Sequence, residues 1–148
     1  MRSAYRVLAI LVVLGVLVQA AAIAYGWFQV INDVEAGGAF TSDSESARNA
    51  GHILHGTVGM MVMPAIALLL LIVSFFAKLP GGVKWAGIVL GLVVLQVVLA
   101  IVSFGAPLVG ALHGANALAI LGAAIYASRL AATSEPHVPA PADARAAA

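Results

Sequence analysis

The chain contains 148 residues, of which 63% are hydrophobic and only 9% are charged, and its mean hydropathy is +1.08. Soluble domains are about 45–50% apolar and about 25% charged, so this composition excludes a water-soluble globular protein. The net charge of +1 comes without a basic run, which excludes nucleic acid as a partner, and the lack of cysteine excludes disulfides and thiolate metal sites.

The first uncharged segment predicts a membrane-spanning helix at 7–31. It follows Arg2 and Arg6, and a signal peptide is the alternative because small residues occur at 20–22. The apolar core of a signal peptide is only about 7–15 residues long. This segment continues through Trp27 to residue 31, so a retained span is favoured.

Three further spans are predicted at 51–77, 85–104 and 108–128, because about 20 apolar residues cross the hydrocarbon core. A polar segment at 32–49 separates the first two spans. The turn around Pro80 and the turn that contains Pro107 separate the others. The spans place the membrane domain at 1–131. The tail at 132–148, which contains His137, is predicted to be disordered and cytoplasmic.

The bases give an expected orientation. Only Arg48 falls on the side of the polar segment, and the other bases of the membrane domain fall on the opposite side: Arg2, Arg6, Lys78, Lys84 and Arg129. Basic residues are enriched in cytoplasmic loops. We therefore expect a multi-pass protein of the bacterial cytoplasmic (inner) membrane with both termini in the cytoplasm.

The short turns predict an all-α, up-down-up-down membrane four-helix bundle. The chain also resembles two copies of one helical hairpin. The first span of each copy contains a glutamine, Gln19 or Gln96, and the second contains Leu-His-Gly, at His55 or His113. Two spans restore the original direction, so the copies are expected to be parallel repeats about an axis along the membrane normal.

Under this symmetry His55 and His113 face a common axis near the outer surface. Histidine within a membrane usually faces the bundle interior, and a pair from opposed helices can hold a haem iron from both faces. Small residues beside the histidines would leave room for a flat macrocycle: Gly56, Gly59, Gly110, Gly114 and Ala117. Ordinary packing of membrane helices and hydrogen bonding between the two histidines are alternatives.

Counted from the outer ends of their spans, His55 and His113 lie at similar depths, and this measurement is preferred. Counted from the cytoplasmic bases they do not, because His55 lies 23 residues from Lys78 and His113 lies 16 residues from Arg129. At 1.5 Å per residue the difference is about 10 Å, unless a proline such as Pro64 bends the second span.

Other polar residues have less specific interpretations. His52 lies one turn from His55 and is a weaker alternative ligand, with a solvated interfacial side chain favoured. Asn116 shares a face with His113 and could bind a substituent of the macrocycle or orient a partner, and a hydrogen bond that joins two helices is an equal alternative. Gln19 and Gln96 are expected to join helices, and the methionines at 60–63 are expected to fill space.

The segment 96–124, QVVLAIVSFGAPLVGALHGANALAILGAA, resembles a helical hairpin of the haem A synthase family, which assists cytochrome oxidase assembly. The segment around His55 resembles the histidine of the preceding helix in the same half of that family. The similarity spans about 52–125. It implies axial ligation of a b-type haem by His55 and His113. The chain has one half-bundle and no glutamate in a span, so haem A synthesis itself is not implied.

The leading hypothesis is a bis-histidine haem b protein for electron transfer or haem handling, with a membrane redox or assembly partner. No acid–base pair lies within the spans, which argues against an enzyme. The alternative is a non-catalytic accessory or assembly subunit without a cofactor. A transporter is less favoured because few polar groups could line a path, and homo-oligomerisation is left open.

Overall fold

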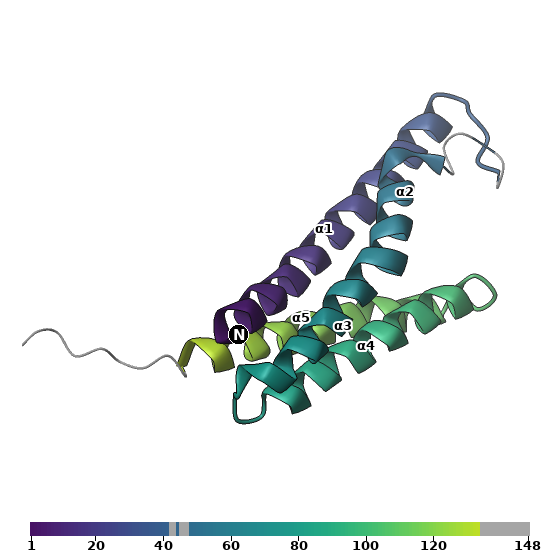
Figure 1. Ribbon diagram of the computed structural model, residues 1–148. Helices are drawn as coiled ribbons and strands as arrows, with labels where there is room; N and C mark the ends of the chain where they lie inside the picture. The colour runs from purple at the N-terminus through teal and green to yellow at the C-terminus, as the bar shows by residue number, and fades with distance from the viewer. Residues whose placement is uncertain (42–43, 45–47, 134–148) are drawn as a thin grey trace, which may run out of the picture.

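The computed structural model describes residues 1–41, 44 and 48–133. These residues contain the helical segments α1 (Arg2–Glu35), α2 (Ala50–Thr57), η2 (Val58–Val62), α3 (Met63–Ala77), α4 (Gly82–Ser103) and α5 (Val109–Thr133) (Figure 1). Because α2, η2 and α3 continue without a break, the described residues form four long helices, each long and apolar enough to cross a membrane. The predicted all-α four-helix bundle of a multi-pass membrane protein is confirmed at this level.

The helices extend beyond the predicted spans. α1 reaches Glu35, so Asn32 and Asp33, which were expected in the following loop, belong to its last turns. α4 begins at Gly82 and α5 continues to Thr133. Hydropathy marks only the apolar part of a helix, and the backbone hydrogen bonding continues into the polar boundary. The predicted tail is helical at 132–133, and its remainder, 134–148, lies outside the described residues.

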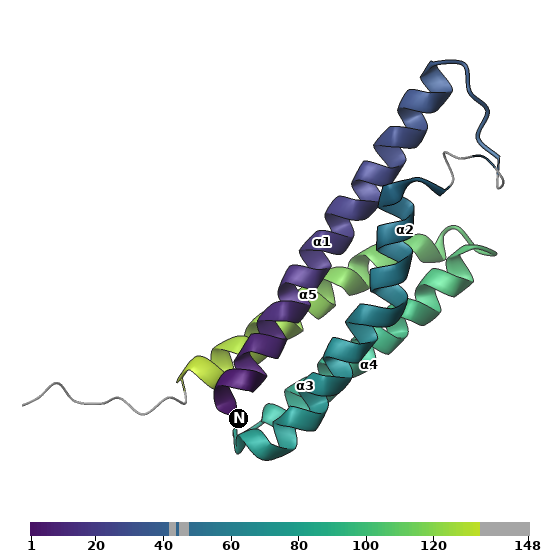
Figure 2. The ribbon, with the colours of Figure 1, turned by 45° about the horizontal axis from the view of Figure 1, so that its top comes forward.

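One end of the bundle, here called the inner end, contains the start of α1, the α3–α4 turn and the end of α5 (Figure 2). Nε of Arg2 donates to the carbonyl of Ala77 at 3.4 Å, and the hydroxyl of Tyr5 donates to the carbonyl of Gly82 at 3.0 Å. The turn needs a positive φ of 77° at Gly81, which glycine adopts without strain. These contacts fasten α1 to the α3–α4 turn.

The buried apolar core occupies the half of the bundle next to this end, here called the inner half. Each long helix contributes, from Tyr5 at the inner end to an outer limit of four residues: Val16, Met63, Val93 and Ile120. Many of the core positions are alanine, which lets helix backbones approach closely. The outer half, beyond these four residues, has no continuation of this core within the described part of the chain.

In the outer half, α1 and α2 pack closely through glycine. A Cβ added to Gly51 would collide with the backbone of α1 at Ala22 and Gly26. Asn49 secures the start of α2, because its side-chain oxygen accepts from the amide of His52 at 3.0 Å and its amide donates to the carbonyl of Gly26 at 2.8 Å. This hairpin is therefore held together by close backbone contact and a cap.

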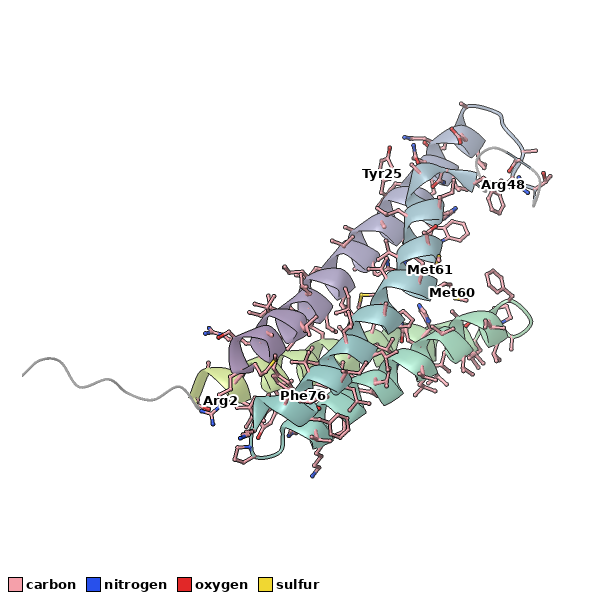
Figure 3. All side chains as sticks on the ribbon, in the orientation of Figure 1. Arg2, Tyr25, Arg48, Met60, Met61 and Phe76 are labelled. Atoms are coloured by element: carbon pink, nitrogen blue, oxygen red, sulfur yellow. The ribbon has the colours of Figure 1, made fainter. Side chains whose placement is uncertain are left out.

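The α1–α2 hairpin and the α4–α5 hairpin diverge toward their outer loops, which lie well apart in both views (Figures 1 and 2). Figure 3 shows the length of the bundle, with Arg2 and Phe76 near the inner end and Tyr25 and Arg48 near the outer end. Within the long helix that contains α2 and α3, η2 is a π-helical turn in which the amide of Met63 donates to the carbonyl of Val58. Pro64, the second residue after this turn, lacks the amide that an α-helical bond would need, which explains the change of helix type.

Candidate functional site

A cavity of about 870 Å³ lies between the two hairpins in the outer half. Its inner limit includes Val16, Met63 and Val93, which are the last residues of the buried core. Most of its lining is apolar, and five residues contribute polar side chains: Gln19, His55, Gln96, Ser103 and His113. Pockets for cofactors are mostly apolar with a few placed polar groups, and their volumes are about 300–1,000 Å³.

His55 and His113 meet across this cavity, as the repeat predicted. Their ring centres lie 6.2 Å apart and the ring planes are inclined at 63°. His55 comes from α2 and His113 from α5, each within the first two turns of its helix. The two rings therefore lie close together, on opposite hairpins.

The count from the outer ends of the spans was the better guide to this arrangement. Ring centres that are 6.2 Å apart exclude the difference of about 10 Å in height that the count from the bases gave. Because the hairpins are inclined to each other (Figure 2), residue counts along the helices do not convert directly into height. α5 also continues past Arg129 to Thr133, so this base does not mark the end of its helix.

The two histidines make the same hydrogen bond in their own hairpins. Nδ1 of His55 lies 3.0 Å from the carbonyl oxygen of Gln19, and Nδ1 of His113 lies 3.1 Å from that of Gln96. A carbonyl can only accept, so both Nδ1 atoms carry the proton. In the neutral rings each Nε2 is then an acceptor with a lone pair available for a metal.

The surroundings of the two Nε2 atoms differ. Nε2 of His113 lies 3.1 Å from the side-chain amide nitrogen of Gln96, which donates to it. The oxygen of the same amide accepts from Nδ2 of Asn116 at 2.7 Å, and Asn116 also donates to the carbonyl of Leu92 at 2.9 Å. Asn116 therefore fixes the orientation of Gln96, and it does not itself line the cavity.

The predicted small residues all line the cavity, but they serve it differently. A Cβ added to Gly56 or Gly114 would meet no atom within 4 Å, so these two positions border open space. A Cβ on Gly59 would lie 3.0 Å from the side-chain oxygen of Gln19. Gly59 therefore makes room for a glutamine, whereas Gly110 and Ala117 contribute to the wall as expected.

His52 does not point into the cavity. Its ring lies 5.2 Å from that of Trp27, edge to face, and against Gly26 of α1. The ring is thus packed on α1, whereas a solvated ring was expected at this position. The reason is the close approach of α1 and α2, which leaves the side chain of His52 only partly exposed.

Met60 lines the cavity from η2, where it and Met61 are labelled in Figure 3. Met63 instead reaches Gly15 of α1 in the buried core. The interpretation of these methionines as space-filling side chains agrees with both positions. The π-helical turn that carries Met60 was not predicted, although Pro64 was the available signal.

The sequence did not predict that the backbone carbonyls of the two glutamines would bind the histidines. Gln19 and Gln96 were expected to join helices through their side chains, but their carbonyls are what both histidines bind. The side chain of Gln96 does join α4 to α5, as expected. The amide nitrogen of Gln19, in contrast, is buried and has no hydrogen-bond partner among the described residues.

No family model, no curated protein and no solved structure matches this chain.

Proposed function

We propose that this chain is an integral membrane protein that binds a b-type haem between His55 and His113, for electron transfer or haem handling. The observation that carries the proposal is the separation of the two rings across an apolar cavity. The proposal includes the parallel hairpin repeat, because the same histidine-to-glutamine bond occurs in both hairpins.

The separation suits two ligands on opposite sides of one metal ion. Metal–imidazole bonds are about 2.0–2.1 Å long, as at zinc, and a five-membered ring with bonds of about 1.33 Å would bring the two ring centres to about 6.3–6.5 Å. The rings are 6.2 Å apart. Edge-to-face ring pairs also have centres about 4.5–7 Å apart, so the distance fits ligation and a direct contact of the two rings alike.

The number of ligands favours haem over a bare metal ion. Within the described ranges, no group of three or more His, Asp or Glu side chains is placed to hold a metal ion. Zinc sites use three or four protein ligands. A porphyrin brings its own equatorial nitrogens and needs from the protein only the axial pair.

The hydrogen bonds of the Nδ1 atoms support the same assignment. A ligating histidine usually donates its other ring nitrogen to a carbonyl or carboxylate, which fixes the tautomer and makes the ligand more basic. The carbonyls of Gln19 and Gln96 meet this requirement. Because backbone atoms supply the acceptor, the side chains of both glutamines remain available for other contacts.

The haem would supply one-electron chemistry, and the protein would set its position and surroundings. The chain's own residues would bind the iron through two imidazoles and would hold those rings by backbone carbonyls, and the buried core would keep water from the inner side. No acid–base pair is needed for electron transfer. The resemblance to the haem A synthase family is consistent with this proposal.

An absorption spectrum of the purified chain, expressed with haem supplied, tests the proposal. We expect about one haem per chain and a reduced-minus-oxidised difference spectrum typical of a b-type cytochrome. The double variant His55→Ala/His113→Ala should lose the pigment. His52→Ala is the matched control, because this histidine faces α1, and it should keep the pigment. Wild-type protein without pigment, or pigment that survives in the double variant, would reject the proposal.

A second function is favoured by one contact. The Gln96 amide already satisfies Nε2 of His113, and Asn116 completes the network without any ligand. Such a network also suits an accessory subunit that packs against a larger membrane complex. In that case the double histidine variant should still assemble with its partner and support the same function as the wild type.

The orientation is also proposed rather than measured. The bases Arg2, Arg6, Lys78, Lys84 and Arg129 belong to the inner-end helix termini and turn, which favours a cytoplasmic inner end in a bacterial cytoplasmic membrane. Since the chain has no cysteine, Ser3→Cys and Ser44→Cys can be labelled singly in intact cells. An impermeant maleimide should label position 44 and not position 3.

A further inference from the structure

The two hairpins are not equivalent around the cavity. In the α4–α5 hairpin, the amide of Gln96 donates to Nε2 of His113 at 3.1 Å. In the α1–α2 hairpin, the corresponding amide of Gln19 is turned toward Gly59, and its nitrogen has no partner. The histidine nitrogen that would bind iron is therefore engaged on one side of the cavity only, as far as the described contacts show.

The difference originates in one residue. Asn116, three positions after His113, holds the oxygen of Gln96 at 2.7 Å and so directs its nitrogen toward the histidine. The residue three positions after His55 is Val58, which has no polar group to hold Gln19 in the same way. The sequence repeat thus preserves the histidine and the glutamine but not the side chain that orients the glutamine.

We infer that His55 is the permanent axial ligand and that His113 is an exchangeable one, which Gln96 holds when it is not bound to iron. The inference rests on the proposed haem function. Binding of His113 to iron breaks the N–H···N bond from Gln96 and forms an iron–nitrogen bond, with no proton transferred and no change of oxidation state. Release of His113 reverses both changes, and leaves one axial position open to an external ligand.

Gln96 and Asn116 are therefore positioning residues. They do not touch the iron, and they act by stabilising the unbound state of His113. A hydrogen bond of this kind has a modest net effect, so its loss should strengthen binding of His113 about two- to tenfold. This effect is large enough to change the fraction of six-coordinate haem without abolishing binding.

The first test compares single histidine variants of the full-length protein. His113→Ala should keep most of the pigment, in a five-coordinate high-spin form that binds carbon monoxide rapidly. His55→Ala should bind haem about two- to tenfold more weakly than His113→Ala does, because its remaining histidine is held by Gln96. Equal loss of pigment in the two variants would overturn the inference and leave the proposed haem site intact.

The second test uses a matched pair of glutamine variants. Gln96→Leu removes the amide but keeps the backbone carbonyl that binds His113. It should raise the low-spin fraction and slow carbon monoxide binding about two- to tenfold. Gln19→Leu makes the same change in the other hairpin, where Nε2 of His55 receives no glutamine contact from the described residues, and should shift both quantities less than Gln96→Leu does. Equal shifts in the two variants would contradict the assignment.

A third measurement does not depend on haem. In haem-free protein with ¹⁵N-labelled histidine, both Nδ1 atoms should carry the proton, and Nε2 of His113 should show the shift of a hydrogen-bonded nitrogen. Gln96→Leu should remove the difference between the two Nε2 signals. If His55 and His113 give the same Nε2 shift in the wild type, the inferred contact does not exist. A wild type without pigment rejects the proposed function instead.

Discussion

The inner and outer halves of this bundle are made from the same four helices, yet they are packed differently. In the inner half, side chains such as Leu70, which is 0% exposed, fill the space between helices that are joined by hydrogen bonds to a tight turn. In the outer half the two hairpins diverge and enclose an 870 Å³ cavity with a histidine on each side. We infer from this comparison that the inner half provides most of the stability and that the outer half contains the proposed site.

This division has a physical reason. Lipid tails are as apolar as leucine, so association of membrane helices depends on close packing and on hydrogen bonds rather than on the hydrophobic effect. Alanine at core positions of all four long helices provides the close packing in the inner half. The helices that line the cavity in the outer half make fewer such contacts. The inner half and the α1–α2 contact must therefore provide the packing that holds the bundle together.

The largest effect on stability is expected at Leu70. Leu70→Ala should lower the free energy of unfolding in detergent micelles by about 2–5 kcal/mol, because it creates a void in the filled half. Leu17→Ala is the control, since Leu17 is 53% exposed and lines the cavity. It should change stability by less than about 0.5 kcal/mol. Similar losses in the two variants would show that the halves do not differ in packing.

The next effect concerns the one close contact of the outer half. Gly51→Ala would push a methyl group into the backbone of α1 and should cost about 1–3 kcal/mol, in the same micelle unfolding measurement. Gly56→Ala places the same group five residues later in α2–α3, where no atom lies within 4 Å. That variant should be neutral or slightly stabilising, because alanine is the better helix former.

A smaller effect is expected at the inner-end fastening. Tyr5→Phe removes the hydroxyl that donates to the carbonyl of Gly82 and should cost about 0.5–1.5 kcal/mol. Tyr25→Phe is the matched control in the outer half, because Tyr25 is 55% exposed. Unfolding in micelles should distinguish them, and a loss at Tyr25 equal to that at Tyr5 would contradict the assignment of stability to the inner half.

The sequence predicted the architecture and the proximity of His55 and His113, because both depend on the pattern of residues along the chain. Uncharged lengths mark the spans, and rare polar residues in equivalent places mark His55 and His113. The prediction failed for His52, whose position depends on a three-dimensional relation, because the close contact at Gly51 packs its ring against α1.

The sequence limited the number of possible contacts of Asn116 but did not select one of them. Its spacing from His113 placed both on one face, which left a contact with a macrocycle, a contact with a partner and a hydrogen bond between helices as alternatives. The structure shows the last of these, because Asn116 in α5 bonds Gln96 in α4 and does not line the cavity. The difference between the two hairpins also arises from Asn116, because it orients the side-chain amide of Gln96. Sequence periodicity does not predict which way a side-chain amide points.

The smallest change in stability is expected where the cavity is filled. Gly114→Leu adds a side chain that points into open space beside α5, and leucine is a better helix former than glycine. The free energy of unfolding should therefore change by less than about 1 kcal/mol. The pigment-to-protein ratio should nevertheless fall, because the added side chain occupies space beside His113. Gly114→Leu should therefore lower the pigment-to-protein ratio while the free energy of unfolding stays nearly unchanged.

Gly122→Leu is the control for this variant, because Gly122 also borders open space in α5 but does not line the cavity. It should show the same small change in stability and keep the pigment. If Gly114→Leu retains full pigment, the cavity beside His113 is not where the haem lies. If it instead loses several kcal/mol of stability, the outer half is packed as tightly as the inner half, and the division between a stabilising half and a binding half fails.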